Sequence, residues 1–149
     1  MHQQIRTSPG SVGGNVSRAV EALARRGVNV EGVGPDYESP HVRIVVPHDA
    51  TEDAIEALEG IPDFTPRAVP ACTFALAHRP GQLDVVLQRV ASAGFEVQSV
   101  LVLASRYRGM TLVSVGLHRE PSSTECEALG CVEEPKGWIG GDLEGSAAS

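Results

Sequence analysis

An internal repeat constrains this 149-residue chain more than any other feature of its sequence. The segment NVSRAVEALARRGVNV, residues 15–30, aligns without a gap on QLDVVLQRVASAGFEV, residues 82–97. In both copies apolar residues recur at i, i+3, i+4, i+7 and i+8, which is the pattern of one face of an amphipathic helix. Each helix is predicted to end at a glycine, Gly27 or Gly94, because glycine readily adopts the left-handed conformation that closes many helices.

The residues that follow each helix extend the repeat. Two segments alternate enough to be half-buried strands, HVRIVV at residues 41–46 and TLVSVGL at residues 111–117. A second helix is predicted after each strand, because residues 49–52 and 122–125 both have the spacing of a capping box.

These second helices are predicted to end at Gly60 and Gly130, and a last strand should follow each of them, near residues 64–69 and 131–133. Each copy then reads βαββαβ, the ferredoxin-like arrangement in which four antiparallel strands carry two helices on one face. The expected fold class is therefore α+β, with two tandem units of this type.

The chain is expected to divide into a first domain at residues 1–70, a second domain at residues 71–135 and a tail at residues 136–149. No linker separates the copies beyond Pro70, so the two units should pack tightly. The tail is rich in glycine and other small residues, which predicts disorder.

The repeat resembles the ACT domain family. AHRPGQLDVVLQRVASAGFEV, residues 77–97, is similar to the first strand, turn, helix and second strand of an ACT domain, and ARRGVNVEGV, residues 24–33, is similar to the same region in the first copy. The resemblance covers about residues 3–133 as two tandem copies. It implies domains that commonly pair side by side into an eight-stranded sheet and regulate an enzyme or transporter. Here we expect a stand-alone tandem protein whose catalytic partner, if it has one, is on another chain.

In the family, amino acids or other small molecules commonly bind between paired domains. The resemblance implies contacts from the loop after the first strand and from the polar position that opens the second strand, and the N–H groups at the start of the first helix suit a ligand carboxylate. The implied ligand-binding residues are Thr7, Ser8, Gly10, Ser11, Val12 and Asn29 in the first copy, and His78, Arg79, Gly81, Gln82, Leu83 and Glu96 in the second.

Two departures distinguish the copies from the family pattern. Residues 11–14 lengthen the first loop by four residues, which should reshape or close its site. Glu96 stands where the first copy has Asn29, and its carboxylate would repel a ligand carboxylate but could pair with an ammonium group. A helix start suits the carboxylate of an amino acid, and each charge-assisted hydrogen bond is worth roughly 1.5–3 kcal/mol.

Nucleotide and nucleic-acid binding are disfavoured. The stretch SPGSVGGN, residues 8–15, is rich in glycine but lacks the Gly-Lys-Ser/Thr of a phosphate loop. The net charge of −7 and the aromatic content of 4% oppose the basic, aromatic surface that RNA-binding sheets use. No catalytic constellation stands out, and an enzyme on this scaffold would need a cleft that holds a titratable residue with a perturbed pKa.

The three cysteines are Cys72, Cys126 and Cys131. Their odd number, and an N-terminus MHQQIRTS without an apolar signal core, argue against a disulfide framework and favour the cytosol. Cys126 and Cys131 have no matching pair of ligands beside them in the sequence, so ordinary reduced thiols are expected, with no metal and no cofactor. Apolar runs are too short to span a membrane.

The sequence therefore favours a non-enzymatic regulatory protein, a homodimer that binds an amino acid or similar small metabolite at an interface between ACT-like domains. The alternative is a regulatory or structural subunit that binds a protein partner without any small ligand.

Overall fold

The first half of the chain forms a four-stranded antiparallel sheet with two helices. The computed structural model describes residues 2–7, 14–38 and 41–132. The strand order is β2-β3-β1-β4, and a 3₁₀ turn, η1 (His48–Ala50), precedes the second helix. The elements in chain order are β1 (His2–Thr7), α1 (Gly14–Arg25), β2 (Gly32–Pro35), β3 (Val42–Pro47), α2 (Thr51–Glu59) and β4 (Arg67–Val69).

The second half has the same succession of elements along the chain, without the last strand. Its antiparallel sheet has the strand order β5-β7-β6. Its elements are β5 (Ala71–Leu76), α3 (Gln82–Ser92), β6 (Val97–Tyr107), β7 (Met110–Leu117) and α4 (Ser123–Leu129). The predicted fold class, two tandem ferredoxin-like units, is confirmed. Pro70 alone separates β4 from β5, and its carbonyl accepts a 3.0 Å hydrogen bond from the Leu117 N–H.

The last strand of each unit is shorter than the sequence predicts. Between residues 64 and 69 only β4 forms, because Asp63 has a positive φ of 71° and Phe64 packs into the core. Among the described residues after α4, Cys131 and Val132 form no strand, although the Val132 N–H donates to the Thr73 carbonyl over 2.8 Å. The chain there lies against β5 through one bond, and Glu133 lies outside the described residues.

One of the two predicted capping boxes is present. Ser122 accepts a 3.1 Å hydrogen bond from the Glu125 N–H, and the Glu125 carboxylate accepts one of 3.0 Å from the Ser122 N–H. The capping box predicted at residues 49–52 is wrong. η1 occupies that position, so α2 begins after Ala50. The methyl side chain of Ala50 has no polar atom that could cap the helix.

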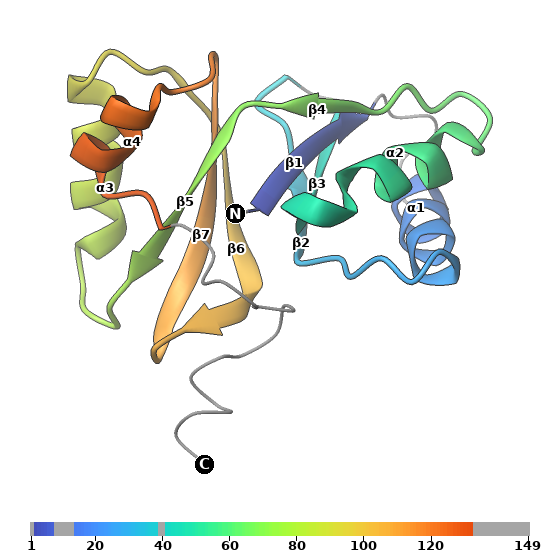
Figure 1. The fold of residues 1–149 in the computed structure, drawn as a ribbon, viewed down its shortest axis with the longest axis horizontal. Helices are drawn as coiled ribbons and strands as arrows, with labels where there is room; N and C mark the ends of the chain where they lie inside the picture. The colour runs from blue at the N-terminus through green and yellow to red at the C-terminus, as the bar shows by residue number, and fades with distance from the viewer. Residues whose placement is uncertain (1, 8–13, 39–40, 133–149) are drawn as a thin grey trace.

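Each sheet carries its two helices on one face, and the helix-free faces of the two sheets meet in the middle of the molecule (Figure 1). Strand alternation explains this arrangement. Ile44 of β3 packs with α1 and α2, while its neighbour Val45 packs against Leu101, Leu103 and Leu112 of the other sheet. The side-by-side, eight-stranded sheet implied by the family resemblance does not form within the described chain.

Strands β2 and β6 also approach edge to edge. The Ala104 N–H donates to the Glu31 carbonyl over 2.8 Å, and the Tyr37 N–H donates to the Gln98 carbonyl over 3.1 Å. Between these bonds Gly34 faces Leu101 so closely that a Cβ atom would clash with the leucine side chain. A larger residue at position 34 would therefore require the Leu101 side chain to move. Within the part of the chain described, no helix is long and apolar enough to cross a lipid bilayer.

Candidate ligand pocket at the start of α3

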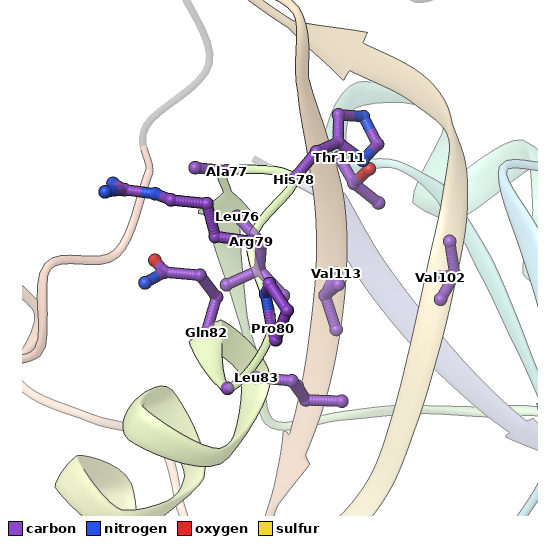
Figure 2. A pocket seen from close by; sticks show the side chains of 11 residues that line it. Leu76, Ala77, His78, Arg79, Pro80, Gln82, Leu83, Val102, Thr111 and Val113 are labelled. Atoms are coloured by element: carbon purple, nitrogen blue, oxygen red, sulfur yellow. The ribbon is translucent and has the colours of Figure 1, made fainter.

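A pocket of about 500 Å³ lies where the β5–α3 loop meets the second sheet (Figure 2). Its walls come from the end of β5, the loop, the first turn of α3 and the adjoining strands β6 and β7. The lining residues are Leu76, Ala77, His78, Arg79, Pro80, Gly81, Gln82, Leu83, Val102, Thr111 and Val113.

The loop is a tight turn that the sequence His-Arg-Pro-Gly specifies. The Arg79 N–H donates to the Ala77 carbonyl over 2.8 Å, and the Arg79 carbonyl accepts from the Gln82 N–H over 3.4 Å. Gly81 has a φ of 83°, in the left-handed region, and a Cβ atom there would meet no heavy atom within 4 Å. Its backbone conformation, rather than lack of space, therefore calls for glycine.

The start of α3 gives the pocket its polar side. The first turn of a helix has backbone N–H groups without intrahelical partners, and it carries the positive end of the helix dipole. No side chain caps α3, and among its first N–H groups that of Gln82 donates to the Arg79 carbonyl over 3.4 Å. His78 and Arg79 are exposed, and Figure 2 shows the Arg79 and Gln82 side chains extending from the loop on the side away from Val113 and Val102. This edge can receive an anionic group.

The opposite wall is apolar. Leu76 is buried and Val113 is 2% exposed, whereas Leu83 is 37% and Val102 is 66% exposed. Val102 precedes an irregularity in the pairing of β6 with β7, between Val102 and Arg106. Figure 2 shows Val102 on the strand that faces the loop across the pocket. Uncovered apolar side chains beside a polar helix start suit a small molecule with one charged end and one apolar end.

The structure brings together five of the predicted ligand-binding residues: His78, Arg79, Gly81, Gln82 and Leu83. Glu96 does not line this pocket. Its N–H donates to His118 Nδ1 over 3.0 Å, just before β6 begins and beside the residue that follows β7. Thr111, at the start of β7, lies at the other end of the sheet, about 20 Å along the strand at 3.3 Å per residue.

In the first unit the predicted residues are dispersed. Thr7 is buried at the end of β1 opposite Val42, and Asn29 is exposed between α1 and β2. Four more predicted residues, Ser8, Gly10, Ser11 and Val12, lie outside the described residues. A smaller pocket of about 240 Å³ lies between α1 and the end of α2 and contains none of the predicted residues.

Six lining residues were missed by sequence reasoning: Leu76, Ala77, Pro80, Val102, Thr111 and Val113. The alternation of residues 111–117 predicted a half-buried strand, so it identified which positions share a face but not what lies opposite them. The position of Val102 depends on the order β5-β7-β6, which places β6 at the sheet edge.

A buried polar cluster lies between the two sheets. Arg43 of β3 pairs with Asp36 and donates to Gln4 over 2.9 Å and to Gln98 of β6 over 3.0 Å. Burial alone would raise the pKa of Asp36, but the hydrogen bonds from Arg43 and from the Glu38 N–H outweigh burial and lower it. Asp36 is therefore a carboxylate at neutral pH and holds the Arg43 guanidinium across the interface.

The same cluster continues into the second sheet. The Gln4 amide nitrogen donates to the Ser114 hydroxyl over 2.8 Å, and the Ser99 hydroxyl donates to the Gln4 amide oxygen over 2.8 Å. These bonds join β1 to β7 and β6. Polar side chains thus fix how one sheet sits on the other.

Comparison with known proteins shows which solved structures share this fold. No protein-family model matches the chain, and no curated protein sequence matches it. Among solved structures, the chain is similar to the ligand-free regulatory subunit of aspartate kinase from Thermus thermophilus, with 23% identity, 89% of this chain and 92% of that chain covered, and a TM-score of 0.58. The corresponding subunit from Thermus flavus is similar at 23% identity, with 87% of this chain and 88% of that chain covered and a TM-score of 0.58.

A protein from Bacteroides thetaiotaomicron is similar at 17% identity, with 87% of this chain and 85% of that chain covered and a TM-score of 0.61. These likenesses extend over both sheets. The chain thus has the tandem ACT-type fold of the regulatory subunits, and the resemblance seen in its sequence is confirmed as a resemblance of fold.

Proposed function

We propose that this protein is a non-enzymatic regulatory protein that binds an amino acid, or a similar small carboxylate, in the pocket at the start of α3. One observation carries the proposal. The turn that resembles the ligand loop of ACT domains forms a pocket of about 500 Å³ with an uncapped helix start on one side and exposed apolar side chains on the other.

Each part of an amino acid has a counterpart in this pocket. The carboxylate would accept hydrogen bonds from the first N–H groups of α3, with Arg79 adding positive charge. An apolar side chain would cover Leu83 and Val102, which removes apolar surface from water at about 25 cal/mol per Å². The Thr111 hydroxyl would accept a hydrogen bond from the ammonium group.

The fold supports a regulatory role, because the similar structures from Thermus are regulatory subunits of aspartate kinase. In the proposal, residues 1–70 and 71–135 act as the two ACT-like domains of a cytosolic homodimer, and the regulated enzyme is a separate chain. Val102 and Val100 lie exposed on the edge strand β6, where a second copy would cover them together with the ligand. Binding would then favour one packing of the domains over another.

The test is a thermal-shift series with the purified full chain and each of the twenty amino acids at millimolar concentration. A ligand at 100 times its Kd adds about 2.7 kcal/mol of stability, so a selective rise in melting temperature is expected for one or a few amino acids. The rise should disappear in Arg79→Ala and in Val102→Asp. It should persist in Arg67→Ala, which removes an exposed arginine from β4 outside the pocket.

The exposed valines of β6 also favour the second candidate function, a subunit that binds a protein partner without a small ligand. In that case no amino acid raises the melting temperature. Val102→Asp then weakens binding of the partner while Arg79→Ala does not. A rise that is equal in Arg79→Ala, Val102→Asp and the unchanged protein would contradict the proposed pocket.

A further inference from the structure

The three cysteines of the chain converge on one place in the second unit. Cys72 comes from β5, Cys126 from α4 and Cys131 from the segment after α4. Their three Sγ atoms all lie within 4.8 Å of one another. Cys72 is buried, and Cys126 and Cys131 are half-buried. Sequence reasoning compared only Cys126 with Cys131 and missed Cys72, which a different strand supplies.

The end of α4 brings two of these thiols together. Gly130 has a φ of 80°, and its N–H donates to the Glu127 carbonyl over 3.2 Å. The Cys131 N–H donates to the Cys126 carbonyl over 3.1 Å. This pair of bonds is a Schellman motif, in which the residue after the glycine contacts the residue at the start of the last turn. Those two positions usually hold apolar side chains, and here both hold cysteine.

Backbone bonds also hold the third thiol in place. Cys72 lies in β5, where it pairs with Val115 of β7, and its side chain faces the core between the sheet and the two helices. The Val132 N–H donates to the Thr73 carbonyl over 2.8 Å, which anchors the segment with Cys131 beside β5. Strand, helix and turn therefore fix the three thiols independently of any ligand.

We propose that Cys72, Cys126 and Cys131 bind a thiophilic divalent cation of the Zn²⁺ class. Tetrahedral Zn²⁺ with Zn–S bonds of about 2.3 Å requires sulfur atoms about 3.8 Å apart, which small side-chain rotations reach from the present spacing. Three cysteines leave the fourth position to water or another small ligand. The apolar surroundings, which include Phe74 and Leu129, favour soft sulfur ligands that bring the metal a low net charge.

Among the described residues, a second cluster of candidate ligands has a different character. Asp36, Glu38 and His41 also lie close together, but Arg6 contacts all three, at 3.2 Å, 2.8 Å and 3.3 Å. A guanidinium thus already supplies the positive charge there. Beside the three cysteines, the Arg89 guanidinium donates to the Leu129 carbonyl over 3.0 Å.

The test uses the full chain, reduced with a phosphine and titrated with Cd²⁺ or Zn²⁺. Cd²⁺ should produce a thiolate-to-metal charge-transfer band in the ultraviolet that saturates at one ion per chain, and Zn²⁺ should compete for the same site. Cys126→Ser and Cys131→Ser should each weaken Cd²⁺ binding at least tenfold. Circular dichroism checks that these two variants fold, since both positions are half-buried.

The control variant is Glu38→Gln, which removes an exposed carboxylate of the other cluster and should leave Cd²⁺ binding unchanged. Three results would each overturn the proposal. They are the absence of a charge-transfer band in the folded, reduced protein, equal Cd²⁺ affinity in the two serine variants and the unchanged protein, or a Cys126–Cys131 disulfide that persists after the phosphine treatment.

Discussion

Arg43 and Asp36 form an ion pair whose two side chains are 1% and 0% exposed. The pair lies where the sheets meet, and Arg43 spans the interface by donating to Gln98 of β6. Arg6 binds the second carboxylate oxygen of Asp36 at 3.2 Å. One buried carboxylate thus holds two arginines, and each of them would remain buried or half-buried without it.

Asp36→Asn should lower the free energy of unfolding by about 3–5 kcal/mol, because it leaves the Arg43 charge buried without its partner. The matched control is Glu38→Gln, which removes an exposed carboxylate that binds the same Arg6 and should cost about 1 kcal/mol or less. Urea denaturation of both variants measures the difference. Equal midpoints for the two variants would contradict the role given to the buried pair.

Gly116→Ala should destabilise the protein by about 1–3 kcal/mol through overpacking. A Cβ atom at Gly116 would clash with the Ser99 hydroxyl and the Arg43 guanidinium, both of which belong to the buried cluster between the sheets. Gly60→Ala is the control, because a Cβ there meets nothing closer than the Ala57 carbonyl at 3.4 Å. The prediction is wrong if thermal melting ranks the two variants equally.

His2 should make stability depend on pH between about 4 and 6.5. Burial lowers the pKa of His2 from 6.5 to about 4, so the unfolded chain binds a proton in this range that the folded chain does not. Stability is therefore lost as the pH falls from 6.5 towards 4, by up to about 1.4 kcal/mol per pH unit. Denaturation at several pH values should show this slope, and His2→Gln should remove it.

Ser122→Ala should cost about 1 kcal/mol, because Ser122 caps the first turn of α4. Ser123→Ala replaces the next residue, which is exposed and takes no part in the capping box, and should change stability by less than half of that. Chemical denaturation compares the two. If Ser123→Ala costs as much as Ser122→Ala, the capping box contributes nothing specific.

The order of elements could be predicted because local signals fix it. Gly27, Gly94 and Gly130 all have positive φ values at the predicted helix ends. The tip of the β6–β7 hairpin also follows from local chemistry, since Arg108 and Gly109 both have positive φ. Short-range chemistry of this kind depends only on residues that are neighbours in the chain.

The arrangement of the two sheets could not be predicted, because it depends on contacts between residues far apart in the sequence. By strand alternation, the Val45 side chain lies on the face of β3 that points away from the first core. It is buried because the second sheet covers that face. The pocket was predicted in part for the same reason. The loop at His78 and Arg79 is local, whereas Val102 reaches it through the order of the strands.

Pro70 is the only residue between β4 and β5, so a single nearly continuous extended segment belongs to both sheets. The halves also share the core around Val45 and the buried cluster around Arg43. Neither half can expose its inner face without uncovering that of the other. We therefore expect the described chain to unfold cooperatively, in one calorimetric transition, although its sequence consists of two copies of one unit.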